Sequence, residues 1–223
     1  MMRILIADDH AILRQGLKQI LDDEFNDTQI GEADSAAETL QQLRKQPWDV
    51  LILDINMPGR SGLEVLHETR QHFSGVPVLV LSSTPEDQLG MRVLKAGARG
   101  YLNKQAAPEE LVNAVRRVMA GSYYVSAALA EKLAAELGRS TEHPPHETLS
   151  DREFQVFRMI IAGKSVKEIA TELSLSGKTI STFRRRIFEK LGVHNNVDLL
   201  FYAQQHGLIE SAPGIEPPSS QSS

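Results

Sequence analysis

The sequence predicts two successive domains, a parallel α/β sheet followed by a set of short helices. Up to about residue 120, short apolar runs alternate with longer helix-like segments, and these runs are apolar throughout. Such runs are typical of parallel strands covered by helices on both faces. From Leu149 to Ile209 only short helical patterns follow. A length of 223 residues suffices for two domains.

Five strands and five helices are predicted in the first domain, residues 1–121. The strands are the apolar runs at 3–7, 29–33, 49–53, 76–82 and 99–102. The helices have apolar residues every three or four positions and occupy 11–21, 35–44, 62–72, 86–96 and 108–119. Alternation of this kind predicts a doubly wound parallel sheet.

The rest of the chain divides into a linker, an all-helical domain and a tail. A helix over 126–137 and a polar stretch with two prolines make 122–148 a linker that contains a helix. The helical domain spans 149–210, and two of its helices open with a Ser-x-x-Glu capping box. The low-complexity tail 211–223 is predicted to be disordered.

Composition limits the compartment and the partners. There is no cysteine, no apolar run of membrane-spanning length and no signal-peptide pattern, so we expect a soluble, cytoplasmic protein with no membrane partner. The net charge of −5 is uneven: residues 1–120 carry 13 basic and 17 acidic residues, whereas 149–210 carry 9 and 7. Within Lys178–Lys190 there are five basic residues and one acidic residue. This asymmetry indicates two different partners.

Charged and polar side chains follow the predicted strands at the point where the strands end. Asp8 and Asp9 follow the first strand, Asp54 the third, Ser82 the fourth and Lys104 the fifth. Because the carboxyl ends of parallel strands share one edge of a sheet, we expect these side chains to converge. Crowded carboxylates require a cation, and oxygen ligands favour Mg²⁺.

Taken singly, these residues have simpler interpretations. An aspartate at a strand end, such as Asp54, is more often a helix cap or a turn former, and Asp8 could cap the first helix. Tyr101 could be a half-buried packing residue. His10 is interpreted as a loop residue, since Mg²⁺ prefers oxygen ligands.

Residues 3–119 resemble the receiver domain of bacterial two-component response regulators. The motifs that carry the resemblance are the "DD" after strand one, the "D…MPG" after strand three, the Ser after strand four and the Lys after strand five. The resemblance implies a flavodoxin-like sheet and makes Asp54 the acceptor of a phosphoryl group from a sensor histidine kinase. It also implies Mg²⁺ binding by Asp8, Asp9, Asp54 and the backbone carbonyl of Asn56. The phosphoryl-binding and switch residues that it implies are Ser82, Tyr101 and Lys104.

The sequence departs from the family pattern beside Lys104, and it does not fit two enzyme alternatives. Asn103 and Gln105, on either side of the lysine, depart from the residues that the family usually has there. An aspartate-nucleophile phosphatase would carry a second acid two residues after Asp54, and Asn56 cannot act as a general acid. "AGKS" (162–165) fails as a phosphate-binding loop because Arg158 stands where its first glycine belongs. We therefore expect no enzyme.

Residues 149–209 resemble the LuxR-type helix-turn-helix. The matching segments are "LSxRE", "AGKSxKEIA", "LSLSGKTIS" and "EKLGV". Together the two halves resemble response regulators of the NarL/FixJ subfamily. The resemblance implies a DNA-binding transcription regulator controlled by phosphorylation of Asp54. The alternative is a regulator that binds DNA independently of phosphorylation and uses its receiver domain as a protein-interaction module.

The segment 177–191 is predicted to be the recognition helix. Ile180, Phe183, Ile187 and Leu191 recur every three or four residues and form its inward face. Base-edge contacts are predicted from Ser181, Thr182 and Arg185, and phosphate contacts from Lys178, Arg184, Arg186 and Lys190. Thr179 completes the predicted DNA-binding set. The alternative for "RRR" is a solvated charged face.

Helix-turn-helix proteins usually bind paired half-sites as dimers, so a homodimer is expected when the chain is phosphorylated. The final helix, about 197–206, and the residues after it supply the candidate dimer contacts Val197, Leu200, Phe201 and Leu208. Packing within the domain is the alternative for each of these residues.

Overall fold

The computed structural model describes residues 1–106, 108–137 and 144–209. The predicted tail and most of the polar part of the predicted linker lie outside these ranges. The chain divides into two compact units, one mainly of residues 1–142 and the other mainly of residues 143–223. Among the described residues, no helix is long and apolar enough to cross a membrane.

The first unit is built on five parallel strands in the order β2-β1-β3-β4-β5. The strands are β1 (Met2–Ala7), β2 (Thr28–Ala33), β3 (Val50–Asp54), β4 (Val78–Ser82) and β5 (Gly100–Asn103). Every residue of β3 and β4 is buried, as expected for central strands with helices on both sides. The predicted doubly wound sheet is confirmed.

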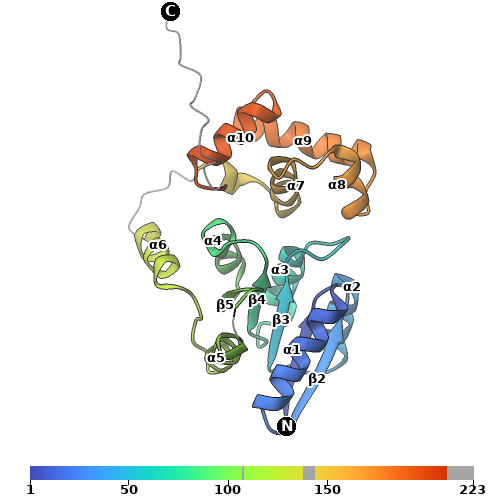
Figure 1. Ribbon diagram of the computed structural model, residues 1–223, viewed down its shortest axis with the longest axis vertical. Helices are drawn as coiled ribbons and strands as arrows, with labels where there is room; N and C mark the ends of the chain where they lie inside the picture. Colours follow the sequence, from blue (N-terminus) through green and yellow to red (C-terminus); the bar gives the residue numbers. More distant parts are fainter. Residues whose placement is uncertain (107, 138–143, 210–223) are drawn as a thin grey trace, which may run out of the picture. The chain divides into compact units, whose positions relative to one another are not determined.

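Five helices cover this sheet (Figure 1). They are α1 (Ala11–Glu24), α2 (Ala36–Lys45), α3 (Gly62–His72), α4 (Glu86–Ala96) and α5 (Pro108–Met119). On one face, Leu21 of α1 and Val115 of α5 pack with Ile4 and Ile52 in the main apolar core. On the other face, α2, α3 and α4 follow one another as neighbours. Layers on both sides leave only the edges of the sheet for polar chemistry.

The strand register aligns the functional strand ends. Ala7 of β1 lies beside Leu53, and Asp54 lies beside Leu81 of β4. Ser82 lies beside Asn103 of β5. The residues that follow β1, β3, β4 and β5 therefore reach the same edge, as the strand pattern predicted.

The segment after α5 returns to the sheet and then forms a sixth helix. The backbone N–H of Tyr101 donates to the carbonyl of Tyr124 at 3.0 Å, which pairs this segment with β5. The helix α6 (Ala127–Leu137) then packs against α4. Its Leu129 is 3% exposed and fills the space above Gly90, and Glu86 of α4 accepts a hydrogen bond from the N–H of Ser126 at 3.1 Å. The linker helix was predicted, but its packing on the first unit was not.

The second unit is all helical. A short 3₁₀ turn, η1 (Pro145–Thr148), precedes α7 (Asp151–Ile161), α8 (Val166–Glu172), α9 (Gly177–Leu191) and α10 (Asn196–Gln205). The turn occupies positions that the sequence assigned to irregular linker. Both predicted capping boxes are present: Glu153 accepts from the N–H of Ser150 at 2.8 Å, and Glu168 accepts from the N–H of Ser165 at 2.7 Å. The second unit is thus the predicted set of short helices.

Candidate phosphorylation site and DNA-binding helix

Lys104 lies between two buried carboxylates at the carboxyl edge of the sheet. Its ammonium is 2.8 Å from Oδ2 of Asp54 and 2.6 Å from Oδ2 of Asp8, and both aspartates are 1% exposed. The other oxygen of Asp54, Oδ1, accepts a hydrogen bond from the backbone N–H of Asn56 at 3.0 Å. The structure thus brings together acids from β1 and β3 with the lysine that follows β5.

The environment raises the pKa of both partners, so it favours the protonated form of each. Burial raises the pKa of Asp54, and the attraction of Lys104 offsets this rise only in part. Burial also disfavours the charged form of Lys104, but Asp54 and Asp8 outweigh it and raise the pKa of the lysine. The lysine is therefore kept protonated, and one positive charge is shared between two acids. Further positive charge would be favourable at this position.

His10 and Asp9 complete the acidic end of the site. Nδ1 of His10 is 3.0 Å from Oδ1 of Asp8 and 2.9 Å from Oδ1 of Asp9. One ligand atom from each of Asp8, Asp9, His10 and Asp54 lies within 4.8 Å of the others. Three carboxylates at this spacing fit the oxygen-donor set that Mg²⁺ prefers, whereas the imidazole contacts carboxylates. Asp8 does not cap α1: the N-cap residue is His10, with no side-chain cap bond.

A chain of hydrogen bonds leads from the surroundings of Asp54 to Tyr101. The side-chain amide of Asn56 donates to Oγ of Ser82 at 3.4 Å, and the N–H of Thr84 donates to the same oxygen at 3.2 Å. The Tyr101 hydroxyl donates to the carbonyl of Thr84 at 2.5 Å, and its side chain is 3% exposed. Tyr101 is thus more than a packing residue, and its contact with Thr84 was not predicted from the sequence.

A glycine allows α3 to begin directly against the strand that carries Asp54. A Cβ atom at Gly62 would lie 2.3 Å from the backbone oxygen of Asp54 and 2.6 Å from Cα of Ile55. The N–H of Gly62 donates to the carbonyl of Ile55, and Ser61 caps the helix by accepting from Leu63 at 3.1 Å. Any side chain at this position would displace the backbone that carries Asp54. The Ser-Gly pair before an apolar run is the signal that the sequence offered.

In the second unit, α9 has the bounds predicted for the recognition helix. Ser176 caps its start, and Gly192 ends it at φ 68°. Ile180, Ile187 and Leu191 are buried, and Phe183 is half-buried. Of the residues predicted to face DNA, those that are exposed are Lys178, Ser181, Arg185, Arg186 and Lys190, and those that are half-buried are Thr179, Thr182 and Arg184.

Several of these residues also make contacts within the domain. The hydroxyls of Ser181 and Thr182 donate to the backbone carbonyls one turn earlier in α9, at 2.9 and 3.0 Å. Thr179 is part of the helix cap, since its N–H donates to Ser176. The ammonium of Lys190 is 2.6 Å from the buried carboxylate of Glu153, which ties the end of α9 to the start of α7. Lys190 was predicted to contact a phosphate of DNA, and in the structure it pairs with a carboxylate of its own domain.

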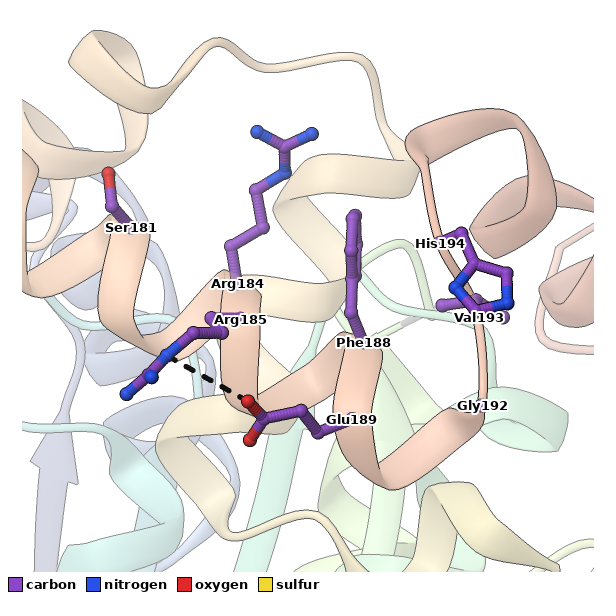
Figure 2. Close-up of a pocket in the computed structure, with 8 residues that line it drawn as sticks. All are labelled: Ser181, Arg184, Arg185, Phe188, Glu189, Gly192, Val193 and His194. Atoms are coloured by element: carbon purple, nitrogen blue, oxygen red, sulfur yellow. Dashed lines mark ion pairs between the residues drawn. The ribbon is translucent and has the colours of Figure 1, made fainter.

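A groove of about 600 Å³ runs along one side of α9 and the turn that follows it (Figure 2). Its lining residues are Ser181, Arg184, Arg185, Phe188, Glu189, Gly192, Val193 and His194. The guanidinium of Arg184 lies over the ring of Phe188, 5.0 Å from its centre. Nε of Arg185 lies 3.9 Å from Oε1 of Glu189. The groove thus includes two of the predicted base-reading residues.

The candidate dimer contacts differ in exposure. Val197 is 60% exposed and Leu200 is 36% exposed, whereas Leu208 is only 8% exposed and Phe201 is half-buried. Leu208 packs within its own domain, which was the alternative interpretation of that residue. Val197 and Leu200 keep an apolar surface on α10 that a second chain could cover.

Comparison with known families assigns both halves of the chain. Residues 4–116 match the response regulator receiver domain, and residues 147–203 match the bacterial regulatory proteins of the luxR family. The response regulator UvrY of Escherichia coli (strain K12) is 36% identical over 212 residues, which cover 95% of this chain and 97% of UvrY. GacA of Pseudomonas aeruginosa is 37% identical over 213 residues, which cover 95% of this chain and 100% of GacA.

Solved structures show the same two-part architecture. RcsB from Salmonella enterica serovar Typhimurium, bound to promoter rprA in the presence of the phosphomimetic BeF₃⁻, matches with a TM-score of 0.62 and 31% identity. This match covers 91% of the present chain and 98% of the RcsB chain. The chain therefore belongs to the NarL/FixJ response regulators, phosphorylation-dependent transcription regulators that join a receiver domain to a LuxR-type DNA-binding domain.

Proposed function

We propose that Asp54 is the residue that accepts the phosphoryl group, and that a sensor histidine kinase donates it. The observation that carries this proposal is the position of Asp54: its carboxylate lies at the sheet edge, beside Lys104 and among the acids of β1. The reaction forms a bond between phosphorus and a carboxylate oxygen of Asp54 and breaks the phosphorus–nitrogen bond of the donor histidine. The donor imidazole leaves with the bonding electron pair.

The residues around Asp54 have separate roles in this transfer. The N–H of Asn56 holds Oδ1 of the nucleophile in place, and the Lys104 ammonium faces the phosphoryl oxygens. Mg²⁺ held by the carboxylates of Asp8, Asp9 and Asp54, with the backbone carbonyl of Asn56, would supply further positive charge there. Asn56 provides no acid for a hydrolytic enzyme, so transfer to Asp54 is the whole of the proposed chemistry.

Phosphorylation would act on Tyr101 through Ser82 and Thr84. The new phosphoryl group adds about −1.5 to −2 charges, which attract the Ser82 hydroxyl away from its present partners. Because the N–H of Thr84 is bound to Ser82 and its carbonyl to Tyr101, a movement of Ser82 disturbs the tyrosine. The face of α4 and β5 is thereby remodelled, and the chain forms a homodimer that binds DNA.

On DNA, α9 would lie in the major groove. Ser181, Thr182 and Arg185 would contact base edges, and Lys178, Arg184 and Arg186 would contact phosphates. RcsB, whose structure resembles this one, has been solved as dimers on DNA, which supports a dimer for the present chain. Val197 and Leu200 of α10 are the proposed dimer contacts.

The phosphorylation step is tested by Phos-tag electrophoresis of the full chain with acetyl phosphate and Mg²⁺. We expect the wild type to show a retarded band and Asp54→Ala to show none. Asp34→Ala is the matched control because Asp34 is an exposed aspartate directly after β2, and it should label like the wild type. Equal labelling of wild type and Asp54→Ala would show that Asp54 is not the acceptor.

The DNA step is tested by mapping bound genomic DNA with and without the phosphodonor. We expect occupancy to increase with phosphodonor in the wild type and to be unresponsive in Asp54→Ala. Binding that ignores both the phosphodonor and the substitution would instead support the regulator that acts independently of phosphorylation.

A further inference from the structure

Glu189 is the one acidic residue between Lys178 and Lys190, where five residues are basic. It lies one turn after Arg185 and, like Arg185, is strongly exposed on α9. A carboxylate beside the phosphates of DNA is repelled by them, so its presence on this face weakens the general attraction of α9 for DNA. Such a group is expected to contribute to selection between DNA sequences.

The side chain of Glu189 is directed toward Arg185. Its Oε1 lies 3.9 Å from Nε of Arg185, and the exposed fractions of the two side chains are 64% and 71%. Figure 2 shows these two side chains approaching each other, whereas Arg184 extends away from them toward Phe188. The carboxylate therefore has a specific partner among the three consecutive arginines.

The atom that Glu189 faces decides what this pair can do. A guanidinium has five N–H donors in a rigid fork, and guanine is contacted by two of them at its O6 and N7 acceptors. The carboxylate lies on the Nε side of Arg185, so terminal nitrogens of the guanidinium stay available for a base. Glu189 can thus restrict the orientation of Arg185 without occupying its base-reading donors.

We propose that Glu189 is a positioning residue that sets the DNA specificity of this protein. It holds Arg185 in an orientation suited to guanine, and its charge weakens binding wherever Arg185 finds no matching base. The proposal rests on the proposed role of α9 in DNA binding. In free protein an exposed pair of this kind contributes little to stability, so its effect belongs to the DNA complex.

The test compares wild type and Glu189→Gln as full chains treated with acetyl phosphate and Mg²⁺. Each is titrated with a duplex selected by the wild type from a random pool and with an unrelated duplex, over a range of salt concentrations. For unrelated DNA, we plot the logarithm of the affinity against the logarithm of the salt concentration. Loss of one negative charge should steepen the slope of this plot by up to about 0.9, which corresponds to roughly an eight-fold gain in affinity at 0.1 M salt. Affinity for the selected duplex should stay the same or fall, so the ratio of specific to nonspecific affinity decreases.

Two further variants separate positioning from a general charge effect. Glu131→Gln removes an exposed carboxylate on α6 and should leave the affinity ratio unchanged. In an Arg185→Ala background, Glu189→Gln should no longer alter the ratio, because its target is absent. The proposal is overturned if Glu189→Gln changes the affinity for both duplexes equally, or if its effect on the ratio persists without Arg185. A wild type that selects no duplex would overturn the DNA-binding role of α9 itself.

Discussion

At the sheet edge, one lysine is shared by two aspartates that lie on different strands. Lys104 contacts both Asp54 and Asp8, so its charge offsets the repulsion between them while each carboxylate remains buried. Buried carboxylates that are only partly compensated favour any added cation. A metal ion at this site would therefore be favourable, and without one the crowded acids lower the stability of the fold.

Asp54→Asn is expected to stabilise the first unit in the absence of metal. Burial raises the pKa of Asp54, so the folded state keeps the proton to a higher pH than the unfolded state does. Ionisation of Asp54 therefore lowers the free energy of unfolding as the pH rises from the ordinary pKa of an aspartic acid to the raised pKa of Asp54 in the folded state. Above this raised pKa the full loss of stability is present. We expect a gain in unfolding free energy on the order of 1 kcal/mol at pH 7, vanishing near pH 3.

This gain is measured by urea unfolding in EDTA, followed by the fluorescence of Trp48, the single tryptophan of the chain. Asp34→Asn is the control and should leave the stability unchanged. A loss of stability in Asp54→Asn at pH 7 would mean that the ion pair with Lys104 outweighs the cost of burial.

The sequence predicted which residues line the site better than it predicted their contacts. Asp54 and Lys104 could be placed because parallel strands end at one edge, a rule that needs only the strand pattern. The bond from Tyr101 to Thr84 depends on the path of one loop, which no periodicity encodes. The pairing of Lys190 with Glu153 joins residues 37 positions apart and likewise could not be deduced from helical spacing.

At the scale of elements, the ion pair between Glu153 and Lys190 fastens α7 to α9. Burial opposes the ionisation of Glu153, but hydrogen bonds from Lys190 and Ser150 outweigh it and hold its pKa below the usual value. A carboxyl group with a lowered folded pKa contributes stability above its unfolded pKa, and this stability is lost as pH falls through the folded pKa. Glu153→Gln keeps the capping box and removes the charge, so we expect a loss of about 1–2 kcal/mol at pH 7.

Hydrogen exchange of the amides in α7 and α9 measures this loss in the second unit alone. The difference from wild type should shrink below about pH 4, the ordinary range of a glutamic acid. Glu168→Gln, in the exposed capping box of α8, is the control and should change exchange little. A difference that persists at low pH would assign the effect to packing instead of charge.

Leu129→Ala is expected to detach α6 from α4 without unfolding the sheet. Leu129 is 3% exposed and fills the space that Gly90 leaves open on α4. Removing such a side chain costs about 2–5 kcal/mol, which exceeds what a helix of this length retains by itself in water. Hydrogen exchange should show faster exchange of α6 amides and unchanged exchange in β1 and β3. Lys132→Ala, exposed on the same helix, is the control, and unchanged α6 protection in Leu129→Ala would refute the prediction.

Most elements were predictable because their patterns are local. The helix at Gly177–Leu191 was predicted with these bounds from the regular recurrence of its apolar residues. The strand β2, only partly buried, gave a weaker pattern, yet its predicted range differs by one residue. The docking of α6 was not predictable, because an apolar stripe identifies a buried face but not the surface that covers it.

At the scale of the whole molecule, the candidate functional sites of the two units carry opposite charges. In the proposed function, the acidic edge of the first unit would take up a phosphoryl group, and the basic face of α9 would bind DNA, a polyanion. The net charge of −5 works against DNA binding, so affinity must come from the local cluster of cations. Phosphorylation would make the first unit more negative still, so we expect activation to act through conformation and dimerisation and not through attraction to DNA.

Tyr101→Phe tests this conformational link because it leaves the acceptor chemistry intact. The substitution keeps the buried ring and removes the hydroxyl that donates to the Thr84 carbonyl at 2.5 Å. We expect unchanged labelling of Asp54 by acetyl phosphate but a smaller gain in DNA affinity on phosphorylation, by roughly three- to tenfold for the loss of about 1 kcal/mol of coupling. Labelling by Phos-tag electrophoresis and DNA affinity by fluorescence anisotropy are measured on the same samples. Tyr123→Phe, at a tyrosine that is 53% exposed, is the control. A full gain in affinity in Tyr101→Phe would show that the signal leaves the phosphorylation site by another path.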